Sequence, residues 1–411
     1  MKDKLEAIIE NIAPSVRNDF LSHKDEIGDD ILFALNSSFT SAAKGNQYSK
    51  DALEFINSVI DRVWEQLNVG NWKDVPECLR DVFAYASFLK AMILLKFTLQ
   101  DDEQNLRQNL IDTLEAIDRG LLLGSSNRQE LCQLASALCP FICDASQKFP
   151  CENFSQLELS KRPSITVPHL KPLPSKECPS IESFLVDHFK PRRPVKLTGC
   201  IKHWPALTKW DNVRYIYEKI GPRLVPVEIG SSYTSSNWSQ KLMTVDAFIK
   251  NFFFSETEER IGYLAQHQLF NQIPELLDDI CEPDYCVLSE NYDDPVGTDV
   301  NAWFGPSNTV SPLHYDPKHN FLAQVVGKKR VFLIDPKWSE NVYPYDDFLL
   351  FNTAQVDLEN IDYEKFPKFE NTEIFECILE AGEMLYIPPK WWHHIRAQSV
   401  SFSVSFWWGN C

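Results

Sequence analysis

The sequence predicts an α+β fold in which an all-α N-terminal domain precedes a C-terminal domain of the jelly-roll type. Three features of the 411-residue chain lead to this prediction: helical periodicity up to about Phe149, a proline-rich stretch after it, and short β-rich runs beyond the prolines. We therefore expect a helical docking domain at residues 1–160, a proline-rich linker at 161–179, and a β-rich domain at 180–411.

The helical prediction depends on apolar residues that recur three and four positions apart. One apolar face is formed by Leu53, Ile56, Val59, Ile60, Val63, Trp64 and Leu67. Two further helical stretches run near residues 78–99 and 105–123. We find no period typical of the helical repeat families, so the simplest interpretation is a helical bundle used for packing or docking.

A cluster of prolines separates the two parts of the chain, and it comprises Pro163, Pro168, Pro172, Pro174 and Pro179. Proline fixes the φ angle and lacks a backbone donor, so this segment cannot continue a helix or a central strand. The prolines therefore mark the expected domain boundary.

The C-terminal part has the signature of short strands. Phe321 to Val326 and Val331 to Ile334 flank a Gly327-Lys328 turn, which predicts a β-hairpin. The last strand alternates apolar residues at 400, 402, 404, 406 and 408 with four serines and Trp407, so one face should pack and the other should be small and hydroxylated. Many short strands indicate a double-sheet jelly roll or barrel, which can hold a ligand between its sheets.

Composition excludes some classes of partner. The net charge is −18, from 40 basic and 58 acidic residues, which argues against direct nucleic-acid binding and favours a basic protein or peptide partner. The 11 cysteines have no CxxC spacing, which suits neither a disulfide framework nor a zinc module and suggests a reducing intracellular environment. No apolar run predicts a membrane segment, and the first residues do not resemble a secretory signal.

The strongest chemical signal is His314-Tyr315-Asp316 with a second histidine, His393, far downstream. Residues two apart on a strand share a face, so His314 and Asp316 can point together into a barrel, where His393 can join them. Two nitrogens and one carboxylate suit non-haem Fe(II) better than a closed zinc site. A lone HxD is nevertheless a weak signal, and taken by itself a structural histidine is the commoner explanation.

Several longer motifs accompany this pattern, and together they resemble the JmjC (jumonji-C) 2-oxoglutarate oxygenases. The motifs are Pro194–Gly199, His203–Ala206, Gly262–Phe270, Asn301–Pro306 and Phe402–Trp408. The resemblance extends from about Pro179 to the C-terminus, and it also includes the helical N-terminal part. It implies a double-stranded β-helix, the cupin-like jelly roll of that family.

The resemblance also implies cofactors and site residues. Fe(II) would be held by His314, Asp316 and His393, with 2-oxoglutarate as cosubstrate and O₂ as oxidant. The cosubstrate pocket would be formed by Tyr263, Trp303, Ser311, Asn320 and Lys329, with Trp407 as a weaker candidate. The substrate pocket would contain Glu228 and Trp238, with Gln266 as a weaker candidate, since a guanidinium prefers a carboxylate and aromatic faces.

The implied activity is protein hydroxylation of arginine side chains, in the nucleus and also in the cytoplasm. The alternatives are a histone lysine demethylase and a metal-dependent endopeptidase of methylated histone tails. A metal-dependent hydrolase and a non-catalytic scaffold also remain open. Without the resemblance, Lys329 would be interpreted as an exposed hairpin lysine, Tyr263 and Trp303 as core residues, and Glu228 as a solvated acid. His394, His267 and His319 are expected to lie outside the metal site.

Overall fold

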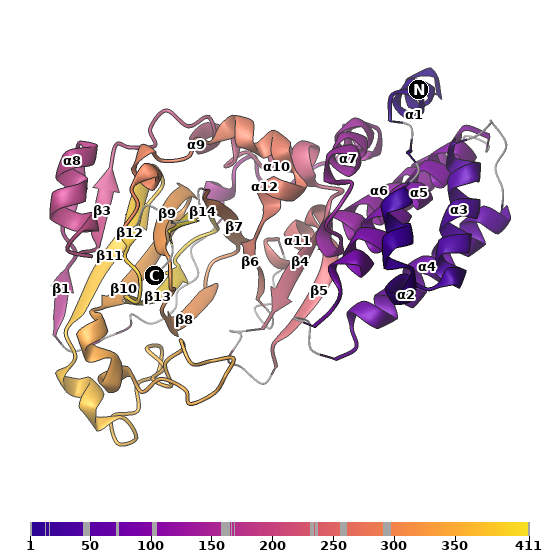
Figure 1. The fold of residues 1–411 in the computed structure, drawn as a ribbon. Coiled ribbons are helices and arrows are strands. Elements are labelled where there is room, and N and C mark those ends of the chain that lie inside the picture. The colour runs from indigo at the N-terminus through magenta and orange to yellow at the C-terminus, as the bar shows by residue number, and fades with distance from the viewer. Residues whose placement is uncertain are drawn as a thin grey trace.

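The computed structural model describes the chain except for residues 1, 13, 16, 44–49, 71–73, 101–104, 158–164, 166, 168, 231–233, 235–236, 255–260, 291–296 and 410–411. Figure 1 shows a helical bundle on one side and a two-sheet β domain on the other. This arrangement confirms the predicted fold class. Two of the linker prolines, Pro163 and Pro168, lie outside the described residues.

The N-terminal bundle is formed by amphipathic helices around one apolar helix. Its elements are α1 (Lys2–Asn11), η1 (Asn18–His23), α2 (Lys24–Ile27), α3 (Asp29–Ala43), α4 (Lys50–Leu67), α5 (Glu77–Gln100), α6 (Leu106–Leu123) and α7 (Arg128–Ile142). Ile56, Val59 and Val63 of α4 are buried as the periodicity predicts, whereas Trp64 is 40% exposed. Helix α5 is long and apolar enough to cross a membrane, but most of its apolar window is buried among the other helices.

The β domain consists of two sheets, whose strands are interleaved along the chain. The smaller sheet has the order β1-β11-β10-β13-β8 and the larger has the order β2-β3-β12-β9-β14-β7-β6-β4-β5. The strands are β1 (Leu170–Pro172), β2 (Ser175–Glu177), β3 (Val195–Thr198), β4 (Leu224–Ile229), β5 (Ser239–Thr244), β6 (Gly262–His267), β7 (Asp299–Gly305), β8 (Val310–His314), β9 (His319–Val326), β10 (Lys328–Ile334), β11 (Ile374–Glu380), β12 (Glu383–Ile387), β13 (Trp392–Ala397) and β14 (Ser401–Trp408).

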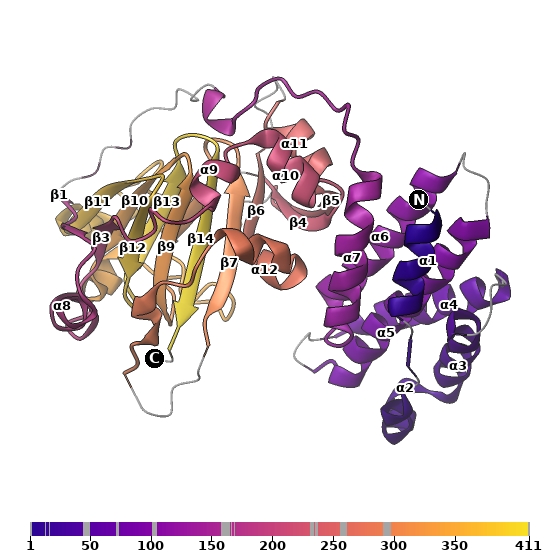
Figure 2. The same cartoon turned by 90° about the horizontal axis from the view of Figure 1, so that it is seen from above.

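Short helices cover the larger sheet and join it to the bundle. They are η2 (Phe154–Gln156), α8 (Ile181–Phe184), η3 (Leu185–Phe189), α9 (Ala206–Lys209), α10 (Val213–Ile220), α11 (Val245–Phe252), α12 (Leu269–Gln272), η4 (Pro274–Asp279) and η5 (Asp284–Val287), while η6 (Pro336–Val342) and η7 (Pro367–Asn371) follow β10. Figure 2 places α12 between β7 and α7, at the side of the β domain that faces the bundle.

A buried ion pair joins the helical bundle to the β domain. Asp118 of α6 and Arg223, which precedes β4, are both at most 1% exposed, and Arg223 Nη2 lies 2.7 Å from Asp118 Oδ1. Asp118 also accepts hydrogen bonds from the backbone N–H of Leu224 and the side-chain amide of Gln272. No sequence pattern predicted this link. The two partners are about one hundred residues apart, and a sequence does not show which acidic and basic residues become buried together.

The predicted hairpin between β9 and β10 is wrong. Strand β9 pairs with β12 and β14 in the larger sheet, whereas β10 pairs with β11 and β13 in the smaller sheet. Gly327, at φ 71°, turns the chain from one sheet to the other, and a Cβ there would lie 1.8 Å from the carbonyl oxygen of Val400. A local strand-turn-strand pattern cannot distinguish a hairpin from such a crossing, because both place two apolar runs beside a glycine.

Strand β14 shows the predicted alternation. Phe402, Val404 and Phe406 belong to the main apolar core. The serines on the other face are also buried, and Ser401 and Ser403 form hydrogen bonds with Gln324 of β9. These small side chains leave room between the two sheets, which is where the candidate site lies.

Candidate metal and cosubstrate site

Three side chains converge where β8 ends beside β13. His314 ends β8, Asp316 follows two residues later, and His393 of β13 is in register with His314. His393 Nε2 lies 3.5 Å from Asp316 Oδ2, and His314 Nε2 lies 3.9 Å from Asp316 Oδ1. One ligand atom from each residue lies within 4.8 Å of the other two, which is close enough for a single metal ion to bind all three.

Hydrogen bonds at the other nitrogen of each imidazole leave Nε2 available for a metal. Nδ1 of His314 lies 2.7 Å from the carbonyl oxygen of Pro312, and Nδ1 of His393 lies 2.9 Å from that of Trp391. A carbonyl can only accept, so Nδ1 carries the proton and Nε2 presents a lone pair. Burial, assisted by His314, lowers the pKa of His393 to about 4, which keeps this imidazole neutral as metal ligation requires.

The donor set fits Fe(II). Two imidazole nitrogens and one carboxylate oxygen on one side of a metal are typical of non-haem iron, and they leave positions for a cosubstrate and O₂. His394 lies on the opposite face of β13, where its Nε2 is 3.5 Å from Glu359 Oε1. His319 is held by Tyr386 and Glu290, and His267 by Gln272, so these histidines lie outside the trio as expected.

A narrow pocket between the sheets connects the trio with a buried lysine. It is lined by Tyr263, Trp303, Ser311, His314, Asp316, Asn320, Leu322, Lys329, His393, Ile395 and Ser405. Lys329 is 2% exposed, so the interpretation of this residue as an exposed hairpin lysine is wrong. Its Nζ donates a hydrogen bond to the Tyr263 hydroxyl, 3.2 Å away, and burial lowers its pKa to about 7.

No carboxylate in the described part of the chain pairs with Lys329, which makes a carboxylate of a ligand the natural partner. The lysine also lies 5.6 Å and 6.0 Å from the ring centroids of Tyr263 and Trp303, so its surroundings are aromatic and poor in water. A small dicarboxylate that binds the metal at one end can therefore reach an ammonium group at the other, as 2-oxoglutarate requires.

The other residues predicted for the cosubstrate pocket differ in their placement. Trp303 Nε1 donates a hydrogen bond to Ser405 Oγ, and Ser311 is buried beside them. The atoms Asn320 Oδ1 and Trp407 Nε1 are both buried and have no hydrogen-bond partner within the described residues. Each of them could form a hydrogen bond with a bound ligand. Trp407 is in register with Asn320 across β14 and β9, but it does not line the pocket.

Three lining residues were missed by the sequence reasoning, namely Leu322, Ile395 and Ser405. Leu322 lies two residues after Asn320, and Ile395 lies two residues after His393. The period-two rule that grouped His314 with Asp316 could have identified both. Ser405 belongs to the hydroxylated face of β14, so its orientation was predicted although its role was not.

Two of the residues predicted to bind the substrate, Glu228 and Gln266, lie on β4 and β6, and the third, Trp238, directly precedes β5. Glu228 of β4 is in register with Tyr263 of β6, and its Oε2 accepts a hydrogen bond from Trp238 Nε1 at 3.2 Å. Burial raises the pKa of Glu228, so this carboxylate would gain from a cationic neighbour. Gln266 is exposed, at φ 47° in an irregular stretch of the β6–β7 pairing, and does not line the pocket.

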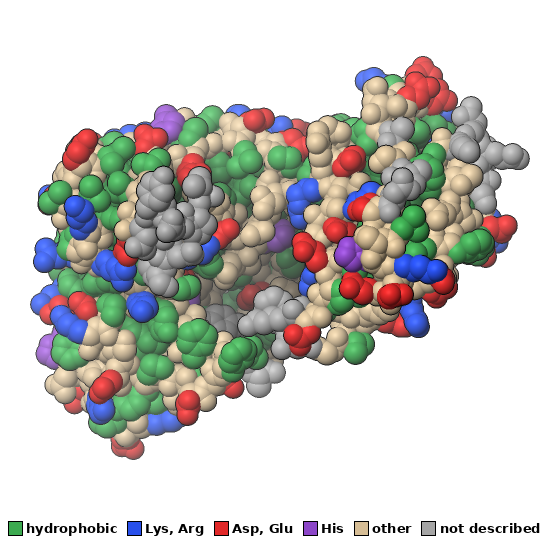
Figure 3. Space-filling view, viewed as in Figure 1, with side chains coloured by type: hydrophobic (Ala, Val, Ile, Leu, Met, Phe, Trp, Pro, Cys, Tyr) green, Lys and Arg blue, Asp and Glu red, His purple; other side chains and the backbone are tan. Residues whose placement is uncertain are grey.

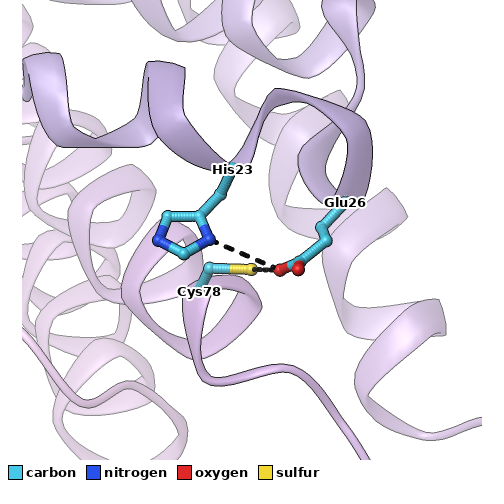
Figure 4. Close-up of side chains that lie close together, drawn as sticks. All are labelled: His23, Glu26 and Cys78. Carbon is cyan, nitrogen blue, oxygen red and sulfur yellow. Dashed lines mark hydrogen bonds and ion pairs between the residues drawn. The ribbon is translucent and has the colours of Figure 1, made fainter.

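A second group of potential metal ligands lies in the helical bundle and comprises His23, Glu26 and Cys78 (Figure 4). Burial and Glu26 raise the pKa of the Cys78 thiol to about 11, so the thiol is protonated and donates to Glu26 Oε2 at 2.9 Å. His23 Nδ1 lies 3.5 Å from the same oxygen, and both His23 and Glu26 are half exposed. These contacts account for the cluster without a metal.

Known proteins are similar to this chain over most of its length. A family model described as a cupin-like domain matches residues 181–410. Lysine-specific demethylase 8 of Xenopus tropicalis is 40% identical over 398 residues, which cover 85% of this chain and 87% of that protein. Jumonji C domain-containing protein 5 of Drosophila melanogaster is 37% identical over 376 residues, covering 89% and 88%. Lysine-specific demethylase JMJ30 of Arabidopsis thaliana is 39% identical over 391 residues, covering 90% and 87%.

Proposed function

The chain belongs to the cupin-like JmjC family of Fe(II)- and 2-oxoglutarate-dependent oxygenases, and from this premise we propose that it oxidises a cationic side chain of a protein substrate. Demethylation of N-methyl-lysine is the first candidate, because two of the relatives above are named lysine-specific demethylases. The observation that carries the proposal is that one narrow pocket joins the metal trio to the buried Lys329, which has no carboxylate partner among the described residues.

Iron and 2-oxoglutarate, when bound, supply the oxidising power: one atom of O₂ enters a substrate C–H bond, and the other enters the cosubstrate, which becomes succinate and CO₂. The protein's part is to bind and orient. His314, Asp316 and His393 would hold the metal, and Lys329 would hold the distal carboxylate of 2-oxoglutarate. The apolar and aromatic lining would exclude water from the reacting groups.

The substrate's position would decide between the possible reactions. An N-methyl group that becomes hydroxylated is a hemiaminal, which breaks at its C–N bond to release formaldehyde and leave the amine. A hydroxylated side-chain carbon is stable and retains the oxygen. The same site can therefore demethylate or hydroxylate, according to which carbon lies near the metal.

Arginine hydroxylation is the second candidate, and the placement of Glu228 favours it. The carboxylate lies on β4 beside the pocket strand β6 and is in register with Tyr263. Trp238 occupies Oε2, which leaves Oε1 available to a guanidinium N–H, while the indole offers a ring face. A methylated ammonium also gains from a carboxylate and an aromatic ring, so Glu228 supports a cationic substrate in both cases.

Peptide mass spectrometry with Fe(II), ascorbate and 2-oxoglutarate distinguishes the candidates. Paired peptides that differ only in one central residue, N-methyl-lysine or arginine, are incubated with the full chain and with a His314→Ala variant as control. Loss of a methyl group with formaldehyde release supports demethylation, and gain of one oxygen on arginine supports hydroxylation. Cleavage of either peptide that persists without 2-oxoglutarate would instead indicate a hydrolase and contradict the proposal.

A basic protein segment such as a histone tail is the substrate class that we propose. The acidic net charge of −18 favours approach of such a segment. A histone substrate requires a nuclear location, which microscopy of the tagged full-length chain tests directly.

A further inference from the structure

We propose that an apolar loop beside the metal trio is a docking surface for a large apolar residue of the protein substrate. This surface, the apolar lip, is formed by Phe348, Leu349 and Phe351. The inference rests on the proposed function, since it assigns the lip to the same substrate whose cationic side chain is oxidised. It adds a requirement that the metal site alone does not impose, namely an apolar residue near the target.

The lip exposes large apolar side chains in a fixed turn. Phe348, Leu349 and Phe351 are 77%, 75% and 58% exposed, although they lie within four consecutive residues. Asp347 Oδ1 accepts hydrogen bonds from the backbone N–H groups of Leu349 and Leu350, at 2.7 Å and 3.2 Å. These bonds hold the turn, so the apolar side chains are presented by a defined backbone.

The residues that follow the lip are hydrogen-bonded to the outer edge of β8, the last strand of the smaller sheet, which ends in the candidate metal ligand His314. Ala354 N–H donates to the carbonyl oxygen of Leu313 at 2.8 Å, Tyr315 N–H donates to that of Asn352 at 3.0 Å, and Thr353 forms a bridge with His314. The ring of Phe351 lies 6.4 Å from that of Tyr315, between the two ligands His314 and Asp316 in sequence. The lip is therefore held directly beside the metal trio.

The surface of the molecule agrees with this placement. In Figure 1 the orange loops that follow β10 lie below β8, and Figure 3, in the same view, shows a hollow with hydrophobic side chains along its lower rim. A polypeptide whose target side chain enters the hollow from this side would cross this rim. An extended chain advances about 3.3 Å per residue, so the residue that contacts the lip should lie a few positions from the target.

Charge identifies the occupant. Asp346 and Asp347 are exposed directly before the apolar residues, and Glu228 lies beside the pocket. An acidic rim with apolar side chains fits a basic segment that contains an apolar residue better than a second copy of this chain, whose net charge is −18. The occupant that we propose is thus a basic polypeptide with a large apolar residue close to the oxidised lysine or arginine.

The test is a binding selection that does not require turnover. Peptides with one fixed arginine or N-methyl-lysine and randomised flanking residues are selected on the full-length protein loaded with Mn(II). The selected peptide is then compared with a partner in which serine replaces its apolar residue. Both peptides are measured against the wild type, against Leu349→Ser, and against Val186→Ser, whose side chain is 64% exposed on η3. Because the changes are on the surface, folding should be retained.

We expect selection of Leu, Phe or Met near the target, and about tenfold weaker binding of the selected peptide to Leu349→Ser. A double-mutant cycle should show that the peptide's apolar residue and Leu349 are coupled, whereas Val186→Ser shows no coupling. The inference is overturned if selection yields no apolar preference, if the two changes are additive, or if the lip mediates self-association or vesicle binding instead. The proposed function fails separately, by an absence of oxidation of peptides that bind.

Discussion

Replacement of Lys329 by methionine should stabilise the unliganded protein and abolish binding of 2-oxoglutarate. The lysine is 2% exposed, lacks a carboxylate partner among the described residues, and has its pKa lowered from 10.5 to about 7 by burial. A change of that size corresponds to roughly 4–5 kcal/mol of free energy that disfavours the folded state at pH 7 and below. Methionine has a similar length and carries no charge, so Lys329→Met removes this cost.

Some of the gain is offset. The hydrogen bond from Lys329 Nζ to the Tyr263 hydroxyl is lost, and the buried hydroxyl then lacks its partner, which costs about 1–3 kcal/mol. We therefore expect a net increase of about 1–4 kcal/mol in the free energy of unfolding. The measurements are guanidinium denaturation at pH 7 and calorimetric titration with 2-oxoglutarate in the presence of Mn(II).

The neighbouring change Lys328→Met is the matched control. Lys328 is partly exposed and lies on the other face of β10, so its replacement should alter neither quantity by much. A Lys329→Met variant that is less stable than the wild type would show that the lysine is not an unpaired cation. Retained binding of 2-oxoglutarate would show that its distal carboxylate is held elsewhere, which would remove the main support for the cosubstrate pocket.

Three further predictions follow from the geometry. The pKa of Lys329 in the free protein is about 7, and only its ammonium form binds a carboxylate. Affinity for 2-oxoglutarate should therefore be full below pH 7 and fall by up to about tenfold per pH unit above it. Calorimetric titration from pH 6 to 9 measures this affinity, and an affinity that does not change with pH would contradict the prediction. Asp118→Asn should lower the free energy of unfolding by roughly 3–5 kcal/mol, because Arg223 then keeps a buried charge without a counter-charge. The control Asp112→Asn, at an exposed position on the same helix, should leave the free energy of unfolding nearly unchanged, and chemical denaturation measures both variants. His314→Ala should lose tight Fe(II) binding while His394→Ala retains it, as measured by metal content after dialysis; equal loss in both variants would place the metal elsewhere.

Sequence periodicity determined most of the secondary structure. The apolar spacing of α4 and the strict alternation of β14 both appear in the structure. A buried face requires apolar residues at the period of its helix or strand, so the spacing of these residues in the sequence predicts the element. The same rule brought His314 and Asp316 to one face and turned His394 away from it. The resemblance of the longer motifs to a known family supplied the remaining candidate site residues, which spacing alone did not.

Tertiary structure decided what depends on the burial of a single group or on distant partners. By composition and spacing, Lys329 is indistinguishable from its neighbours Lys328 and Arg330. Only the second sheet closing over β10 makes it a buried cation with no carboxylate partner among the described residues. The assignment of β9 and β10 to different sheets and the union of Asp118 with Arg223 are of the same kind. Local patterns record which side of a helix or strand is apolar, but the energy of a charge depends on everything packed around it, and the fold alone defines those surroundings.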